Sequence, residues 1–129
     1  LGAELLLYPT AIGSEPAPAA PVDSSGHWQR TMQGHAAANM IPVIASNRIG
    51  TEHATQDSSC ELTFYGHSFI ADHTGALMCN ADHQSETVLV HEFDMKAIRD
   101  YRDAWGIYRD RRPDLYQTLG TLDGCVKSA

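Results

Sequence analysis

The sequence predicts an α/β (α+β) fold, and two adjoining segments carry this prediction. Segment 24–41 has apolar residues at helical spacing, and it leads through Pro42 directly into the apolar run 43–45. A run that is apolar at every position has the pattern of a strand covered on both faces. A helix that delivers the chain into a covered strand is an α/β unit, so we expect the other elements to pack around it.

The chain opens with another strand-like run, residues 5–8, which Pro9 closes. We expect a buried strand that needs neighbours on both edges, and residues 1–4 supply none. Ligands bind beyond the carboxyl ends of strands in open α/β sheets, so the following loop, residues 9–16, is the first place to look for a site. A plain surface connector is the alternative interpretation of this loop. The Ala- and Pro-rich residues 17–22 predict an extended, exposed excursion.

The helix in segment 24–41 has signals at both ends. The hydroxyl of Ser24 or Ser25 is expected to cap the first free N–H groups. Pro42 stops the helix, because proline has no N–H to donate and pushes the residue before it towards extended geometry. The stripe on one face consists of Trp28, Met32, Ala36 and Met40, with His35 and Asn39 alongside.

The middle of the chain predicts short strands and turns. Residues 51–59 are polar and are expected to form a turn, and residues 62–79 predict an antiparallel hairpin. Residues 87–93 predict a further strand, with Val88 and Val90 facing inward.

The last quarter of the chain predicts two helices. Asp94 is a candidate N-cap for the first helix, which Gly106 breaks. Residues 114–119 follow a proline and predict a second, short helix. Residues 109–112 read Arg-Asp-Arg-Arg, and we expect them to form a network of ion pairs with neighbouring aspartates.

Length and charge set limits on the class of protein. A chain of 129 residues fits one domain, which we assign to residues 1–124, with a frayed tail at 125–129. Nine basic and sixteen acidic residues give a net charge of −7, which disfavours nucleic acid or an anionic membrane as a partner. No apolar run approaches the roughly 20 residues of a membrane span, and the first residues lack the basic start of a signal peptide.

Cysteine and histidine spacing predicts neither a disulfide framework nor a metal site. Cys60, Cys79 and Cys125 are odd in number and widely spaced, so we expect a reducing, cytoplasmic compartment. No lysine, arginine or helix start lies near Cys60 or Cys79 to stabilise a thiolate, and each cysteine is expected to be unreactive. No two of the seven histidines stand three or four residues apart, so we expect no metal and no cofactor.

Several blocks of the sequence resemble the C-terminal part of the carbon–nitrogen hydrolase (nitrilase) superfamily. The blocks fall in family order and span residues 2 to about 124. They are 2–6 (GAELL), 8–16 (YPTAIGSEP), 27–28 (HW), 32–36 (MQGHA), 45–50 (ASNRIG), 64–70 (FYGHSFI) and 105–116 (WGIYRDRRPDLY).

The resemblance implies a four-layer αββα sandwich, of which this chain supplies roughly the C-terminal half. The implied partners are the N-terminal half of the same fold and a second copy, through sheet or helix faces and the C-terminal segment. In the chain alone, residues 5–8 and 43–45 are then expected to have unpaired edges and uncovered faces, which favours aggregation.

The chemistry that the resemblance implies uses a Cys nucleophile, a Glu general base and a Lys that holds the oxyanion. In the family these residues precede the strand that follows Gly2-Ala3-Glu4. None of the three cysteines falls at the family's position, so we expect no catalytic residue in this chain. What this half is expected to supply is one wall of the substrate pocket. The residues implied for that wall are Thr10, Ala11, Ile12, Ser14, Glu15 and His27.

The implied substrate is N-carbamoylputrescine, cleaved to putrescine, ammonia and carbon dioxide in polyamine biosynthesis. Glu15 is the expected partner of the distal ammonium, and a solvated loop carboxylate is the alternative. Another linear-amide hydrolase of the superfamily, acting on N-carbamoyl-β-amino acids or ω-amides, is the competing enzyme hypothesis. A non-catalytic assembly partner is the hypothesis from a different class.

Overall fold

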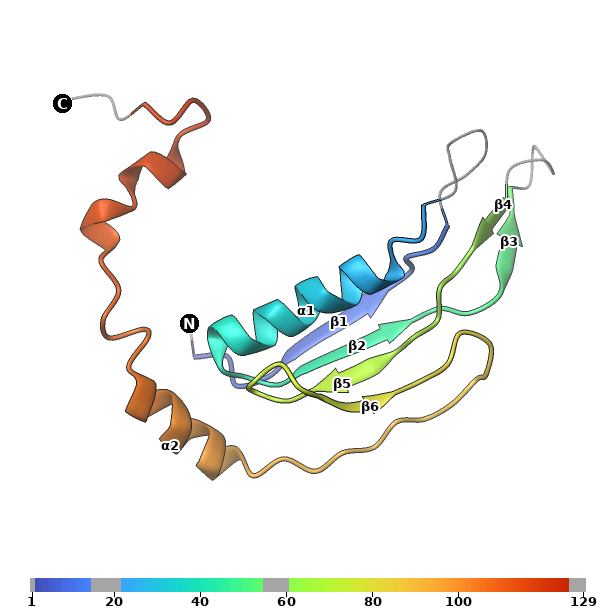
Figure 1. The fold of residues 1–129 in the computed structure, drawn as a ribbon, viewed down its shortest axis with the longest axis horizontal. Helices are drawn as coiled ribbons and strands as arrows, with labels where there is room; N and C mark the ends of the chain where they lie inside the picture. Colours follow the sequence, from blue (N-terminus) through green and yellow to red (C-terminus); the bar gives the residue numbers. More distant parts are fainter. Residues whose placement is uncertain (1, 15–21, 55–60, 126–129) are drawn as a thin grey trace.

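A computed structural model describes residues 2–14, 22–54 and 61–125, and it contains a four-stranded mixed sheet with one helix across it (Figure 1). The helices and strands are β1 (Leu6–Thr10), α1 (Ser25–Asn39), β2 (Val43–Asn47), β3 (Thr51–His53), β4 (Glu61–Thr63), β5 (Phe69–Ala71), β6 (Leu77–Asn80) and α2 (Met95–Trp105), followed by the 3₁₀ turns η1 (Pro113–Leu115) and η2 (Gln117–Gly120). The larger sheet has the order β1-β2-β5-β6, with β1 and β2 parallel and the other pairs antiparallel. This arrangement confirms the predicted α/β class. None of the described helices is both long and apolar enough to cross a bilayer.

Helix α1 covers one face of the sheet with the stripe that the sequence predicts. Trp28 and Ala36 are buried, and the Trp28 ring meets the edge of the Phe69 ring at 5.5 Å between centroids. Burial of this stripe against the sheet holds the helix in place, because a helix of this length gains most of its stability from packing. The core on this face consists of Trp28, Ala36, Val43, Ala45, Phe69 and Ala71.

Both ends of α1 differ in detail from the prediction. The Ser24 side chain caps no helix N–H; its hydroxyl lies 3.3 Å from the Tyr65 hydroxyl, and the Asp23 carboxylate accepts from the Ser25 N–H instead. The helix ends at Asn39, three residues before Pro42, so the proline is not what ends it. Met40 closes it in the left-handed conformation, at φ 50°, with its N–H directed at the last carbonyls.

The other face of the sheet carries a row of apolar side chains. Residues in register across the four strands point the same way, so one row runs through Leu7, Ile44, Ile70 and Cys79. The row is covered unevenly, since Ile70 is 5% exposed and Leu7 is 65% exposed. A sheet that is apolar on both faces requires a layer on each side, as in the four-layer sandwich that the resemblance implies.

The edges of the sheet correct one expectation and support another. Strand β2 pairs with β1 on one side and β5 on the other, so the expectation of an unpaired edge at 43–45 is wrong. Strand β1 pairs only with β2 among the described residues, as expected for residues 5–8.

The middle of the chain departs from the predicted hairpin. Strands β5 and β6 do form an antiparallel hairpin, but β4 leaves it and pairs with β3 in a separate two-stranded sheet. The prediction of a turn from residue 51 onwards is therefore wrong at its start. Polar side chains on both short strands allow this pair to stand in solvent, and the Thr51 and Thr63 hydroxyls meet at 2.8 Å.

Residues 87–93 do not form the predicted strand. Val88 and Val90 were expected to face inward, yet they are 86% and 81% exposed. The segment lacks a strand partner among the described residues. The Cys79 thiol of β6 donates a hydrogen bond to the Val90 carbonyl, at 3.5 Å, which joins the segment to the sheet. Alternating hydrophobicity indicates a strand only where a neighbour supplies a ladder.

Helix α2 begins and ends where the sequence predicts. The Asp94 carboxylate accepts from the Ala97 N–H at 2.9 Å, and Gly106 ends the helix in the left-handed conformation. Ile98 is its buried residue, and the Arg99 guanidinium pairs with Glu4 at 2.8 Å beside the start of β1.

The C-terminal segment after α2 runs away from the sheet (Figure 1). Arg109 pairs with Asp110 and Arg112 with Asp114, both exposed, so the expected pairing with neighbouring aspartates is confirmed. The two pairs are separate, and the expected network is not seen among the described residues. The helix predicted at 114–119 is replaced by the turns η1 and η2, which carry exposed Leu115 and Leu119.

The exposed part of the apolar row predicts that the chain alone self-associates. Leu7→Lys removes apolar surface and places a charge beside the edge of β1, so we expect the aggregated fraction in light scattering to fall severalfold. Leu119→Lys, at an exposed apolar position away from the sheet, is the matched control. An equal fall for both variants would exclude the sheet as the source of association.

Candidate functional site

The candidate site lies at the carboxyl ends of β1 and β2, where two parallel strands end side by side. Thr10 is the last residue of β1 and stands in register with Asn47, the last residue of β2. The segment 10–14 then leaves β1 and runs beside residues 63–65. Carboxyl ends of parallel strands are the usual ligand-binding edge of α/β sheets, as the sequence analysis assumes for this loop.

The Asn47 carboxamide holds segment 10–14 to the end of the sheet. Its Oδ1 accepts from the Ile12 N–H at 2.9 Å and lies 3.2 Å from the Thr10 hydroxyl. Its Nδ2 donates to the carbonyl oxygens of Ile12 at 3.0 Å and Gly66 at 2.9 Å. Four polar contacts of one half-buried side chain thus join three segments of the chain.

A short ladder continues the connection beyond Ile12. The Tyr65 N–H donates to the Ile12 carbonyl at 3.1 Å, and the Ser14 N–H donates to the Thr63 carbonyl at 2.8 Å. Gly13 lies between them, opposite Phe64. A Cβ at Gly13 would lie 2.4 Å from the Thr63 carbonyl oxygen, so the close approach of the two backbones requires glycine.

These bonds decide which polar groups of the predicted wall remain for a ligand. The hydroxyl proton of Thr10 is engaged by the Ser46 carbonyl at 3.0 Å or by Asn47, and the N–H and carbonyl of Ile12 are both used. The Ser14 hydroxyl accepts from the Thr63 N–H at 3.2 Å, and its own proton has no acceptor among the described residues. Ala11 is exposed, and Glu15 lies outside the described residues.

His27 lies in the first turn of α1, which is held at the same end of the sheet. The Tyr65 hydroxyl accepts from the Ser24 N–H and donates to the Val22 carbonyl, both at 3.2 Å. His27 itself is exposed, and its ring makes no hydrogen bond with the described residues. The structure therefore brings the start of α1 and segment 10–14 to one anchor, residues 63–65.

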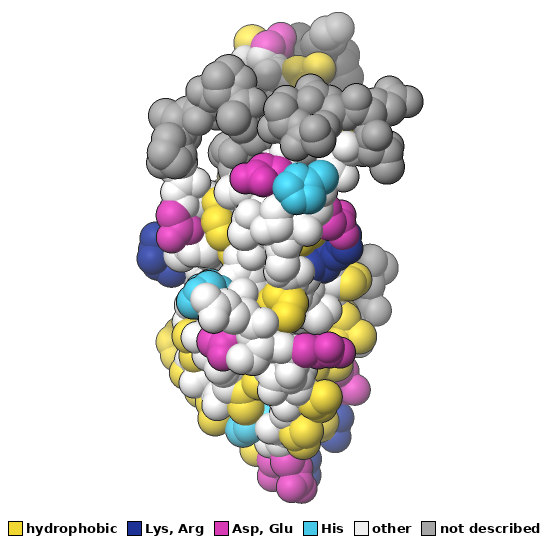
Figure 2. All heavy atoms as spheres, turned by 90° about the vertical axis from the view of Figure 1, so that its right-hand side faces the viewer, with side chains coloured by type: hydrophobic (Ala, Val, Ile, Leu, Met, Phe, Trp, Pro, Cys, Tyr) yellow, Lys and Arg dark blue, Asp and Glu magenta, His cyan; other side chains and the backbone are white. Residues whose placement is uncertain are grey.

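A hollow of about 270 Å³ lies beside Asn47 at this edge. Its other lining residues are Arg48, Ile49, Ser68, Ala81, Asp82, Ser85, Glu86 and Thr87. Figure 2 faces this end of the molecule and shows acidic, basic and histidine side chains interspersed over its upper half, without a large patch of one sign among the coloured side chains. Mixed charge suits a small polar ligand better than a polyanion.

The turn at Asp82 borders this hollow and holds the pKa of its carboxyl group well below the ordinary value. Hydrogen bonds from the Ser85 and Gln84 N–H groups, at 2.6 and 2.8 Å, stabilise the carboxylate, and the Ser85 hydroxyl donates as well. Together they lower the pKa of Asp82 from 3.8 to about 2. The same turn accepts the His67 N–H at the Asp82 carbonyl, which ties it to residues 66–68.

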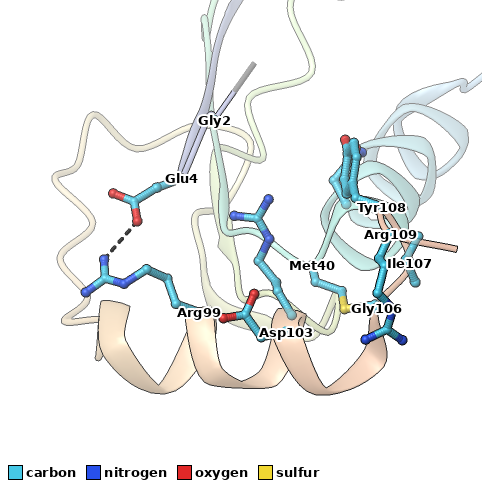
Figure 3. A pocket seen from close by; sticks show the side chains of 11 residues that line it. Gly2, Glu4, Met40, Arg99, Asp103, Gly106, Ile107, Tyr108 and Arg109 are labelled. Atoms are coloured by element: carbon cyan, nitrogen blue, oxygen red, sulfur yellow. Dashed lines mark hydrogen bonds and ion pairs between the residues drawn. The ribbon is translucent and has the colours of Figure 1, made fainter. Parts of the chain in front are cut away.

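A larger hollow, of about 570 Å³, lies at the opposite end of the sheet, between α2 and the start of β1 (Figure 3). The Glu4–Arg99 ion pair spans one side of it, and Asp103 projects towards it from α2. Arg102, also on α2, is another lining residue. Arginine near the end of α2 complements the negative end of the helix dipole, which is a structural role. Because this hollow lies at the amino end of β1, we place the candidate site at the carboxyl ends of β1 and β2 instead.

No cysteine thiol contacts a lysine in the described part of the chain, so these residues do not form the Cys–Lys pair that the implied chemistry uses. The Cys79 thiol is directed at the Val90 carbonyl, the exposed Cys125 thiol lies 3.8 Å from the Asp123 carbonyl, and Cys60 is outside the described residues. Lys96 pairs with Asp100 on α2, at 2.5 Å. The described residues also contain no cluster of three His, Cys, Asp or Glu that could hold a metal.

The model of the carbon-nitrogen hydrolase family matches residues 1–103 of the chain. This chain belongs to the carbon–nitrogen hydrolase family.

Related proteins and solved structures agree with this assignment. The chain is 56% identical over 124 residues to the N-carbamoylputrescine amidase of Arabidopsis thaliana, covering 95% of this chain and 41% of the relative. It is 54% identical over 118 residues to the citrullinase of Francisella tularensis, covering 92% and 40%. The crystal structure of a carbon-nitrogen hydrolase from Helicobacter pylori G27 matches with a TM-score of 0.82 at 34% identity, over 94% of this chain and 42% of that chain.

The chain thus spans about two fifths of the length of the carbon–nitrogen hydrolases that it matches. The structural match confirms the predicted α/β part of a nitrilase-type fold. The position of the catalytic Cys, Glu and Lys stays a prediction.

Asn47 is the residue of this candidate site that the sequence did not single out. From the sequence it stands out only as part of the block ASNRIG. The usable signal was its place: a side chain with two donors and two acceptors at the carboxyl end of a parallel strand. What spacing could not show is that Thr10, Ile12 and Gly66 all come within reach of it.

The close approach at Gly13 predicts a selective loss of stability. Gly13→Ala places a methyl group against the Thr63 carbonyl, so we expect the free energy of unfolding to fall by about 2 kcal/mol or more in chemical denaturation. Gly34→Ala is the matched control, since it lies inside α1 with nothing within 4 Å of the added Cβ. That change should be neutral or stabilising by up to about 1 kcal/mol. Equal losses would contradict the assigned packing.

The lowered pKa of Asp82 predicts a transition in strong acid. A folded-state pKa below the ordinary value means that the carboxylate stabilises the turn above about pH 4, and that this contribution is lost as the pH falls towards 2. In an NMR titration we expect the Gln84 and Ser85 amide signals to shift with a midpoint near pH 2. Asp82→Asn should abolish that shift. A midpoint near 3.8 would contradict the hydrogen-bonded turn.

Proposed function

We propose that this chain is part of an amidohydrolase that cleaves N-carbamoylputrescine to putrescine, ammonia and carbon dioxide, in polyamine biosynthesis. The observation that carries the proposal is the 56% identity with the Arabidopsis thaliana N-carbamoylputrescine amidase over 124 residues, nearly the whole of this chain. The citrullinase of Francisella tularensis is almost as similar, at 54%. N-carbamoylputrescine and citrulline share a terminal ureido group, which is therefore the group that we expect the reaction to attack.

The reaction needs a nucleophile at the ureido carbonyl carbon. A Cys thiolate adds there, a Glu takes the thiol proton and passes it to the departing ammonia, and a Lys balances the charge on the oxyanion. Water then cleaves the carbamoyl thioester and regenerates the thiol. The resulting carbamate falls apart into amine and carbon dioxide. We propose that the Cys, Glu and Lys are supplied by a part of the protein outside this chain.

The role that we assign to this chain is a wall of the pocket at the carboxyl ends of β1 and β2. The described groups best placed to meet a polar substrate are exposed Ala11 and the Ser14 hydroxyl, whose proton has no acceptor within the described ranges. His27 and Glu15 complete the predicted wall, with Glu15 as the partner of the distal ammonium. The hydroxyl of Thr10 and the backbone of Ile12 support the wall from behind through Asn47.

Citrulline hydrolysis is the second candidate, favoured by the citrullinase relative. Citrulline carries a carboxylate beside its ammonium at the end distant from the ureido group. A carboxylate at the pocket mouth repels a substrate carboxylate, so Glu15 favours the amine-ended substrate.

Assembly and location are further parts of the proposal. The apolar row on the second face of the sheet requires a covering layer, which we assign to the rest of the same domain. We also expect a homo-oligomer, because the family resemblance implies pairing with a second copy. The contact surfaces would be sheet or helix faces and the C-terminal segment. A reducing compartment, the cytoplasm, follows from the cysteine count.

Activity measurements on the full-length protein that contains this chain test the proposal. We expect ammonia release from N-carbamoylputrescine with a kcat/KM at least tenfold above that for citrulline, and no release by this chain alone. Preference for citrulline would move the assignment to the second candidate. Ammonia release by this chain at an enzyme-like rate would contradict the placement of the catalytic residues.

The role of Glu15 is tested by Glu15→Gln in the full-length protein. Loss of a charged hydrogen-bond partner is worth about 1.5–3 kcal/mol, so we expect KM for N-carbamoylputrescine to rise about ten- to a hundredfold with kcat nearly unchanged. Glu61→Gln, at an exposed position on β4, is the control and should leave KM unaltered. An unchanged KM in Glu15→Gln would assign that carboxylate to solvent.

A further inference from the structure

We propose that Asn47 is a positioning residue of the reaction, which fixes the substrate-facing segment 10–14 and thereby sets the affinity for substrate. The inference rests on the proposed function, because it requires that this segment lines the pocket. Asn47 itself has its polar groups turned towards the protein, so it acts through the segment and not on the substrate.

The contacts of Asn47 are complete and can be satisfied in one orientation. Its Oδ1 accepts from the Ile12 N–H and lies within reach of the Thr10 hydroxyl, whose proton it shares with the Ser46 carbonyl. Its Nδ2 donates to the carbonyls of Ile12 and Gly66. Rotating the amide by half a turn would set N–H against N–H and oxygen against oxygen. The hydrogen bonds of the carboxamide can therefore form only when segment 10–14 has the backbone conformation seen here.

Asn47 is in turn held by a neighbouring strand. The Ser68 hydroxyl accepts from the Asn47 N–H at 2.9 Å and lies 3.3 Å from the Asn47 carbonyl, to which it can donate. Ser68 immediately precedes β5, which pairs with β2. The clamp is thus built on two central strands of the sheet, whose positions are fixed by the core under α1.

Near the strand ends, the backbone of the segment that Asn47 clamps has few other partners, while the Ile12 side chain packs against the core. Between Thr10 and Gly13 its backbone is joined to the rest of the described chain through Asn47 and through the Tyr65 N–H. Ala11 lies between two clamped residues and is exposed, which is the arrangement expected of a short wall that presents its outer side to a ligand. A shift of about 1 Å in such a wall is enough to weaken binding substantially.

Kinetics of the full-length protein distinguish positioning from a purely structural role. Loosening the wall weakens substrate binding, while the nucleophile and its base, on other residues, keep their geometry. For Asn47→Ala we expect KM to rise at least tenfold and kcat of the folded enzyme to stay within about threefold. A structural role alone would lower the midpoint of denaturation and the active fraction, and would leave KM unchanged.

Three further variants sharpen the test. Asn47→Asp loses both donations and sets a carboxylate oxygen against the carbonyls of Ile12 and Gly66, so its KM should rise at least as far as that of Asn47→Ala. Thr10→Val removes one contact and should raise KM by less than either. Asn80→Ala, which removes a single bond from Gln29 on the exposed surface, is the control that should leave KM unchanged.

Amide hydrogen exchange supplies a readout that does not depend on turnover. In Asn47→Ala the Ile12 and Tyr65 amides should exchange at least tenfold faster, while amides in the middle of β2 change little. A wild-type enzyme that is active, with an unchanged KM in Asn47→Ala, would overturn this inference alone. A wild-type protein without ureido hydrolysis would overturn the proposed function, and this inference with it.

Discussion

The parallel pairing of β1 and β2 is the constraint on which the rest of the structure depends. In register from Leu6 beside Val43 to Thr10 beside Asn47, the two strands end at the same edge. That register lets one amide reach across from β2 to the chain leaving β1. A slip of one residue would turn Asn47 to the other face of the sheet and leave segment 10–14 without its anchor.

Helix α1 makes this pairing possible and also shapes the site. A crossover between parallel strands has to return the chain to the other end of the sheet, and α1 does so over the apolar face formed by Val43, Ala45 and Phe69. Its start then lies at the edge where β1 ends, held by Tyr65. Core packing and site geometry are therefore two results of one βαβ connection, and a change in the core is transmitted to the wall.

The second face of the sheet requires a covering layer. Ile44, Ile70 and Leu7 lie in register with no polar side chain among them, while residues 87–93 pass with their valines exposed. Apolar surface of this kind is stable only under another layer. The match with carbon–nitrogen hydrolases about two and a half times as long gives that layer a source. By our proposal, the reacting groups belong to that same part of the protein.

Local sequence signals determined most of the elements and the family, because they act within a few residues. The stripe from Trp28 to Ala36, the cap at Asp94 and the left-handed glycine at 106 needed no distant partner to be recognised. Strand pairing was different: residues 51–53 became a strand and 87–93 did not, because a strand exists only where a neighbour completes its hydrogen bonds. The sequence predicted where the candidate wall lies, in the loop that contains residues 10–14. Its anchor did not, since Asn47 is 35 residues from Ile12 along the chain and meets it only when the two strand ends are brought together by folding.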